Sequence, residues 1–284
     1  MTASSQELHF ADAGEAADLA AFLARLIHYD RAAAVRLQAG GGVLAVFGRP
    51  PSFEVLAIRT ARLEAIVSTE AVASDASETS DAPVGAAGGP GALDTTVSAG
   101  EFADALDTAR AAQTADGPDG RDRGDRGLVV TVPQAVTGPP WAGVLPPRGG
   151  WRRVNGLPGV QEVHGAVAAA VAEFRARDAA LPEESRTRAE RDRIGHEIWS
   201  RTLGDTGLPL RAVHAAQSLG FLRTVRAAVP AVTAHGSGVA TASPEPLALL
   251  AAGGWLRLRT PYGSIAVRTQ GPSGGLSGLS VTPA

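Results

Sequence analysis

The sequence predicts an α+β protein: an N-terminal helix on a small antiparallel sheet, followed by a mainly helical C-terminal part that ends in a β-hairpin. Three patterns carry this prediction. Apolar residues recur at helical spacing in residues 12–26 and again in 160–174. Segments 35–47 and 255–268 each read as two extended runs around a glycine-containing turn. Hydrophobic residues make up 44% of the 284 residues, so the chain is able to bury a sizeable core.

The first predicted element is a helix that begins near Asp12. Asp12 and Glu15 have the spacing of a capping box, with Asp in place of the usual Ser or Thr. Beyond them an apolar stripe needs a partner surface, and its members are Leu19, Phe22, Leu23 and Leu26.

The sheet that covers this helix is predicted from the next thirty or so residues. Val35 and Leu37 alternate with polar neighbours, the glycines at 40–42 permit a turn, and the chain returns at 43–47. The prolines at 50–51 interrupt the ladder, because proline donates no N–H, and 53–58 is predicted as a third strand.

Residues 1–137 are predicted to form one α+β module that contains two disordered insertions. The insertions are 68–91 and 114–127, where large apolar residues are too few to offset the entropy of ordering. Between and after them, 95–97 is predicted as extended, Ser98 with Glu101 as the capping box of a helix with Phe102 and Leu106 inside, and 128–132 as a strand.

A connector rich in proline and tryptophan, 138–151, follows the first module and is predicted to be stiff and extended. Residues 152–270 are predicted as a mainly helical module with a C-terminal hairpin, and 271–284 as a flexible tail. Within the helical module, 160–174 is one helix and 182–203 a second, with acids suited to its first turn. Whether the two halves share one core is left open.

Composition excludes several classes of chemistry. The chain has no cysteine and no lysine, which removes disulfides, thiolate metal sites, cysteine nucleophiles and Schiff bases. The polar N-terminus is no signal peptide, and no apolar run is long enough to span a membrane, so a soluble cytoplasmic protein is predicted. Residues 1–147 carry 10 arginines and 19 acids, or −9, whereas 148–284 carry 16 arginines and 10 acids, or +6. Such a split favours two modules, unless the acids simply lie in disordered loops.

Residues 208–229 resemble a helix-turn-helix, with Ala216 and Gly220 where a small residue and a turn glycine are usual. With the downstream hairpin as a wing, the segment 208–268 is winged-helix-like, and Arg223 and Arg226 become candidate contacts for nucleic acid. The spacing after Gly220 is one residue short, and Leu222 stands where a capping Ser or Thr is usual. Ordinary packing of alanine-rich helices is the alternative, and it is preferred.

Two groups of arginines differ in their surroundings. Those between 186 and 193 alternate with acids, and pairs such as Glu184 with Arg188 explain them as a solvated helix face. Arg257 and Arg259 share one face of the hairpin with Trp255 and have no local acid. These two are therefore the first choice for binding an anionic ligand.

No pattern predicts a metal, a cofactor or a catalytic residue. The six histidines lack metal-ligand spacing, and the glycines form neither a phosphate-binding loop nor a nucleophile elbow. They are His9, His28, His164, His196, His214 and His235.

The stretch 138–151 (GPPWAGVLPPRGGW) and Gly254–Ala266 (GWLRLRTPYGSIA) resemble uncharacterised conserved proteins of high-GC actinobacteria of the Streptomyces type. This resemblance implies no activity and no site.

The function is not given by the sequence, and three hypotheses follow. The first is a non-catalytic regulatory or scaffold protein that binds another protein, with no cofactor and no membrane association. The second is a nucleic-acid-binding protein that uses 208–268. The third is an enzyme with a dispersed site, for which the sequence offers no residue.

Overall fold

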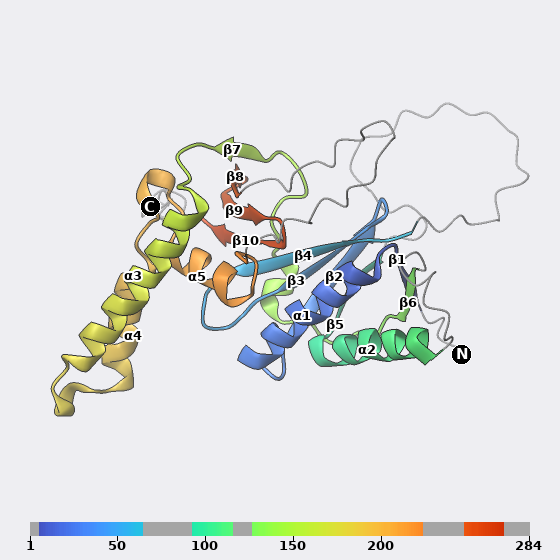
Figure 1. Cartoon of the computed structure of the whole chain (residues 1–284), viewed down its shortest axis with the longest axis horizontal. Coiled ribbons are helices and arrows are strands. Elements are labelled where there is room, and N and C mark those ends of the chain that lie inside the picture. Colours follow the sequence, from blue (N-terminus) through green and yellow to red (C-terminus); the bar gives the residue numbers. More distant parts are fainter. Residues whose placement is uncertain (1–5, 65–92, 116–126, 224–246, 270–284) are drawn as a thin grey trace, which may run out of the picture. The chain divides into compact units, whose positions relative to one another are not determined.

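The structure is a computed structural model that describes residues 6–64, 93–115, 127–223 and 247–269 (Figure 1). The chain forms two compact units. Unit 1 comprises Met1–Gly48 and Arg59–Gly143, and unit 2 comprises Arg49–Ile58 and Val144–Ala284. Mixed helices and antiparallel strands confirm the predicted α+β class.

The sheet of unit 1 has the strand order β5-β2-β3-β4. Its strands are β2 (Ala34–Gly40), β3 (Val43–Gly48), β5 (Leu93–Ser98) and the end of β4 (Leu56–Arg62). The β2–β3 hairpin is confirmed, and Gly41 and Gly42 turn it with φ of 60° and 73°. Such angles suit a two-residue turn whose twist matches that of the strands. A separate antiparallel pair is formed by β1 (Glu7–Phe10) and β6 (Leu128–Thr131).

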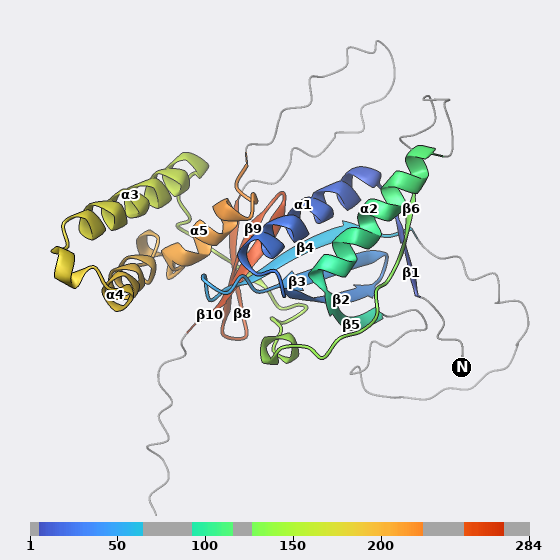
Figure 2. The same cartoon turned by 90° about the horizontal axis from the view of Figure 1, so that it is seen from below.

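Helices α1 (Ala13–Tyr29) and α2 (Ala99–Ala115) lie side by side on one face of this sheet (Figure 2). The predicted apolar stripes are confirmed, because their members are at most 1% exposed. These residues are Leu19, Phe22, Leu23 and Leu26 of α1 and Phe102 and Leu106 of α2. Val35, Leu37, Leu44 and Val46 of the sheet complete the core.

One of the two predicted helix caps in unit 1 needs correction. Asp12 caps α1 by accepting from the Gly14 N–H at 2.6 Å, but the Glu15 carboxylate accepts from the Arg62 backbone N–H and, at 2.8 Å, from Arg62 Nε. The Glu15 carboxylate, which a capping box would require, is therefore bonded to Arg62 of β4 instead. At Ser98 the predicted cap is present, since its Oγ accepts from the Glu101 N–H at 3.4 Å.

The third strand was predicted at 53–58 but runs from Leu56 to Arg62. Residues 51–54 form a turn instead, in which Glu54 has a φ of 51°. The proline pair at 50–51 therefore delays the strand further than the apolar pattern indicates.

The sheet of unit 2 is an antiparallel array in the order β10-β9-β8-β7. Its strands are β7 (Arg152–Val154), β8 (Ala248–Ala252), β9 (Trp255–Thr260) and β10 (Gly263–Arg268). Residues 56–58 of β4 pair with β10, with Ala57 opposite Ile265. The β9–β10 hairpin is confirmed with Pro261 and Tyr262 in its turn, whereas β7 and β8 were not predicted.

The helices of unit 2 are α3 (Val160–Ala179), α4 (Arg188–Trp199) and α5 (Leu210–Ser218). Short 3-10 helices occur at Glu183–Ser185 and Gly204–Thr206, and a further one, Pro140–Gly143, belongs to unit 1. Figure 1 shows α3 and α4 side by side. The stripe of α3 is buried at Val163, Val167 and Ala170, but its first predicted member, Val160, is 37% exposed.

The helix predicted at 182–203 is wrong in its bounds. A 3-10 turn comes first, and α4 begins only after Thr187, whose Oγ1 accepts from the Glu190 N–H at 3.2 Å. Thr187 is a better N-cap than Pro182, because its hydroxyl satisfies a free backbone donor.

Several predictions concern residues outside the described ranges. They are the insertion at 68–91, the part 116–126 of the insertion at 114–127, the tail at 271–284 and residues 224–229 of the helix-turn-helix. The chain passes from unit 1 to unit 2 after Gly48, returns to unit 1 after Ile58, and enters unit 2 again after Gly143.

Candidate anion-binding face

Strand β9 separates apolar from basic side chains by the ordinary alternation of a strand. Leu256, Leu258 and Thr260 are buried on one face. On this face Leu258 and its neighbour Ile265 in β10 are fully buried, and helix α5 contacts β10. Trp255, Arg257 and Arg259 lie on the opposite face, as predicted from their spacing.

The register of the sheet adds two more arginines to that opposite face. Arg268 of β10 is directly across from Trp255. Arg153 of β7 is across from Leu250 of β8, which is itself across from Arg257. Residues directly opposite in an antiparallel pair share a face. We call Arg153, Arg257, Arg259 and Arg268 the arginine face.

Arg257 is half-buried and unusually placed for a charged residue. Its Nε atom is buried and has no hydrogen-bond partner. Its guanidinium carbon lies 5.7 Å from the centroid of the Trp151 ring, within the range of a cation–π contact. Burial, and to a smaller degree the charge of Arg259, lowers the pKa of the Arg257 guanidinium. Arginine nevertheless stays charged at any ordinary pH, so this charge is held in a poorly solvated position.

Two contacts, one made by Trp151 and one made by Pro147, fix the position of the Trp151 ring. Its Nε1–H donates to the Pro147 carbonyl at 3.0 Å. Pro147 in turn lies against the β8–β9 turn, where a Cβ on Gly253 would meet its ring at 3.0 Å. The connector between 147 and 151 therefore holds the indole ring beside the Arg257 guanidinium.

Two other arginines also lie over aromatic rings. The Arg268 guanidinium is 5.4 Å from the Trp255 ring centroid, and that of Arg223 is 3.9 Å from the ring centroid of Tyr262. Arg223 thus sits against the β9–β10 turn, while Arg226 is outside the described residues. Of the three proposed arginines that the structure describes, the register brings Arg257 and Arg259 together on one sheet face.

Sequence reasoning missed Arg268, Arg153 and Trp151. A signal existed for Arg268, because counting outward from the two-residue turn at 261–262 places it opposite Trp255. No such signal existed for Arg153 and Trp151, whose strand partner β8 was itself not predicted.

The charge around this face is entirely positive in the local sequence. Residues 144–161 and 247–269 contain six arginines and no acid. They are Arg148, Arg152, Arg153, Arg257, Arg259 and Arg268. All described acids of unit 2 other than Glu54 lie between 162 and 205, on the helical side of the sequence.

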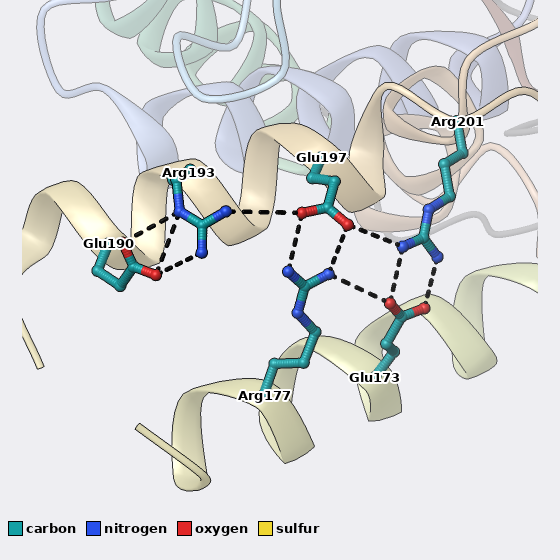
Figure 3. A network of polar contacts seen from close by, with 6 residues as sticks. All are labelled: Glu173, Arg177, Glu190, Arg193, Glu197 and Arg201. Atoms are coloured by element: carbon teal, nitrogen blue, oxygen red, sulfur yellow. Dashed lines mark hydrogen bonds and ion pairs between the residues drawn. The ribbon is translucent and has the colours of Figure 1, made fainter. Parts of the chain in front are cut away.

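Arg177 of α3, Arg193 of α4 and Arg201, which follows α4, form ion pairs with acids, as Figure 3 shows. Arg177 of α3 makes two hydrogen bonds to Glu197 of α4, at 2.9 and 2.8 Å, and Arg201 makes two to Glu173, at 2.6 and 2.8 Å. The hydrogen bonds from Arg177 lower the pKa of Glu197 to about 2, and those from Arg201 lower the pKa of Glu173. These arginines differ from Arg257, which forms no ion pair with an acid of the described ranges.

The solvated helix face predicted at 186–193 is confirmed in kind, with different pairs. Arg188 contacts Asp192 at 3.7 Å, where Glu184 had been predicted as its partner. Arg193 contacts Glu190, and Arg191 contacts Asp178 of α3 at 2.7 Å. Glu184 belongs to the separate 3-10 turn, which removes it from the helical register of Arg188.

Two described histidines have clear packing roles. His214 of α5 stacks on the Trp199 ring at 4.3 Å between centroids and meets the Phe53 ring edge-on at 5.2 Å. Burial lowers its pKa. A ring nitrogen of His164 lies 3.0 Å from the Leu222 carbonyl oxygen. In the described parts of the chain, no three histidines or acids are grouped as a metal site would require.

Comparisons with known proteins leave the chemistry open. No helix in the described ranges is both long and apolar enough to cross a membrane. No curated protein and no solved structure matches the chain. Residues 3–143 match a family described as a domain of unknown function (DUF8010), and residues 146–272 match another such family (DUF8185). The chain therefore combines two regions that each match a family whose function is unknown, in line with its resemblance to proteins without a characterised family.

Proposed function

We propose that this chain is a non-catalytic regulatory protein of the cytoplasm, and that its second unit binds nucleic acid through the arginine face. The observation that carries the proposal is a set of four arginines on one sheet face, drawn from sequence segments that contain no acid. Clustered arginines attract phosphates, and the release of counterions from the nucleic acid contributes to binding.

The extent of the arginine face favours a chain of phosphates over a single one. Arg153 and Arg257 are two strands apart, which corresponds to about 10 Å. Arg259 and Arg268 are separated by four positions along the strand direction, or about 13 Å. One phosphate group is too small to contact all four guanidinium groups, whereas successive phosphates of a polymer are suited to this spread.

This proposal differs from the first hypothesis drawn from the sequence, which is a protein partner. That hypothesis rests on missing catalytic motifs and on the unequal charge of the two halves, neither of which selects a surface. It also differs in location from the winged-helix hypothesis, since it uses the sheet and not a recognition helix after Gly220. An acidic protein remains an outcome that the experiment distinguishes.

The test is the salt dependence of binding to a labelled single-stranded oligonucleotide of about 16 nucleotides, followed by fluorescence anisotropy. Four phosphate contacts predict a slope of log K against log salt concentration of about −3. The double substitution Arg153→Ala and Arg259→Ala is expected to reduce the magnitude of that slope by about 1.4.

Arg188→Ala is the matched control, because the Arg188 side chain is 95% exposed but has Asp192 beside it. The proposal fails if the oligonucleotide does not bind, if binding is insensitive to salt, or if Arg188→Ala weakens it as much as the double substitution. Competition by polyglutamate at equal charge concentration would instead identify an acidic protein as the partner.

A further inference from the structure

Of the four arginines of the arginine face, Arg257 has the surroundings least favourable for a charge. It lies in β9, which has β8 on one side and β10 on the other, and it is flanked there by the apolar Leu250 and Ala266. Trp151 covers it from above the sheet. A charge in such surroundings is destabilising unless it is paired and hydrogen-bonded.

The described residues supply no such pairing for Arg257. Nε is buried without an acceptor, and no described residue forms an ion pair or a hydrogen bond with the guanidinium. Of its three nitrogens only Nε is both buried and unpaired, so the two terminal amino groups stay open to a partner from outside. The unpaired charge of a half-buried guanidinium is a reason to expect a partner from outside, and the terminal amino groups are the atoms that an anion contacts.

The neighbours of Arg257 select the charge of that partner. Arg259 is two positions along the same strand, about 7 Å away, and Arg153 lies two strands away. Two further cations beside the incompletely solvated guanidinium of Arg257 raise the free energy of the protein that has no anion bound. They therefore favour a ligand with a concentrated negative charge.

The neighbours also fix the geometry. The indole ring of Trp151 is itself tied to Pro147, and it limits the orientations of the guanidinium plane beneath it. A guanidinium that is held in this way presents its N–H groups as a fork, which matches two oxygens of one phosphate.

We propose that Arg257 and Trp151 form a subsite for a phosphate group, with Arg259 as the second cation. The inference rests on the proposed function in taking that phosphate from a nucleic acid backbone, but the subsite suits a free phosphate group by the same chemistry. Trp151 is the reporter of its occupancy, because its ring contacts the guanidinium that the phosphate binds.

The substitution Arg257→Met distinguishes a ligand-binding role of Arg257 from a purely structural role, because the two roles predict different changes in Tm. Methionine retains the unbranched apolar stem and packs against an aromatic ring, but it carries no charge. If Arg257 is kept for a ligand, Arg257→Met leaves Tm unchanged or raises it, because an unpaired half-buried charge is removed. If the guanidinium supports the fold, the same substitution lowers Tm.

The experiment uses the full chain and two probes, inorganic phosphate and the labelled oligonucleotide. Tryptophan fluorescence is expected to change as either probe saturates the wild-type protein. The change is expected to persist in Trp141→Phe and to disappear in Trp151→Phe. Arg257→Met is expected to abolish the response to phosphate and to weaken oligonucleotide binding about tenfold, with Arg257→Lys in between because lysine keeps only a point charge.

The outcomes separate the subsite from the proposed function. If Arg257→Met binds the oligonucleotide like the wild type, the subsite is wrong and nucleic-acid binding stands. If phosphate alone binds in an Arg257-dependent way, the subsite stands for a small phosphorylated ligand and the nucleic-acid proposal is wrong. If neither probe changes the fluorescence, or if Arg257→Met lowers Tm, the subsite is overturned.

Discussion

His214 shows how a single side chain links distant parts of unit 2. Its ring is stacked on Trp199 of α4 and touches the edge of Phe53, which precedes β4 in the chain. Both contacts suit a neutral imidazole enclosed by rings. Burial lowers its pKa from the usual 6.5, so the folded state holds the proton less readily than the unfolded state.

The first prediction follows from the sign of that shift. The unfolded protein takes up the proton first as the pH falls, so the contribution of His214 to stability is complete above about 6.5 and declines below it. We expect the urea midpoint of unfolding to fall between pH 8 and pH 5, and His214→Phe to remove part of this fall. His28→Phe, which changes an exposed histidine of α1, is the control. An identical pH profile for His214→Phe and the wild type would refute the argument.

At the scale of residues, the sequence predicted which side chains share a face wherever the alternation along one strand was sufficient. Trp255, Arg257 and Arg259 share a face because a strand has a period of two, and this needed no knowledge of the partners. The cation–π contact of Arg257 could not be predicted, because its partner Trp151 lies more than a hundred positions earlier in the sequence. The role of these arginines in binding remains a prediction.

The helices α3 and α4 are held together at the scale of elements by crossed ion pairs. Glu197 forms an ion pair with Arg177 of the neighbouring helix α3. It also forms ion pairs with Arg193 and Arg201, which are close to it in the sequence. All of these side chains are partly exposed to solvent. Exposed pairs contribute little singly, and a network of them contributes chiefly at low salt.

The second prediction concerns this network. Because the pKa of Glu197 is lowered to about 2, its contribution to stability is present above about 4.5 and is lost as the pH falls towards 2. We expect Glu197→Gln to lower Tm by a few degrees at most near neutral pH, and the difference to shrink in about 1 M salt. Differential scanning calorimetry at two salt concentrations measures both effects.

Glu183→Gln is the matched control, since Glu183 is exposed in the 3-10 turn and belongs to no ion pair in the described part of the chain. A difference in Tm that survives high salt unchanged would show that packing, and not charge, is responsible.

Elements that depend on their own residues were predicted, and those that depend on distant partners were not. The β9–β10 hairpin has its turn and its alternation within fourteen positions. Strand β8 (ALLAA) contains no polar residue and therefore no alternation of apolar and polar side chains, so it gave no strand signal. Strand β1 pairs with β6, more than a hundred positions later, which no local pattern reveals.

At the scale of the whole molecule, ten residues that lie early in the chain belong to the later unit. Arg49–Ile58 is part of unit 2, although it falls inside the family match at 3–143. Leu56, Ala57 and Ile58 pair with β10, and a Cβ on Gly263 would lie 2.9 Å from the Ile58 carbonyl oxygen. The glycine therefore permits the close start of β10 beside β4.

The third prediction tests this arrangement. Ala57→Pro disturbs the ladder opposite Ile265, because proline donates no N–H and is confined to edge strands or bulges. We expect a loss of at least about 2 kcal/mol in the free energy of unfolding. Hydrogen exchange is expected to show lost protection in β10 and β9, two hundred positions away.

Thr60→Ala, at an exposed position of the same strand, is the control and is expected to leave β9 and β10 protected. Protection that is lost in β2 and β3 but retained in β10 would contradict the assignment of residues 49–58 to unit 2.

The arrangement of Arg49–Ile58 bears on how the two matched families came to share a polypeptide. A recombination event near residues 143–146 would separate the region 146–272 from β4, whose residues 56–58 pair with β10. The edge of the sheet at β10 would then have no strand partner. We therefore expect the two regions to be inherited together, and any relative that has only the later one to carry a substitute strand of its own.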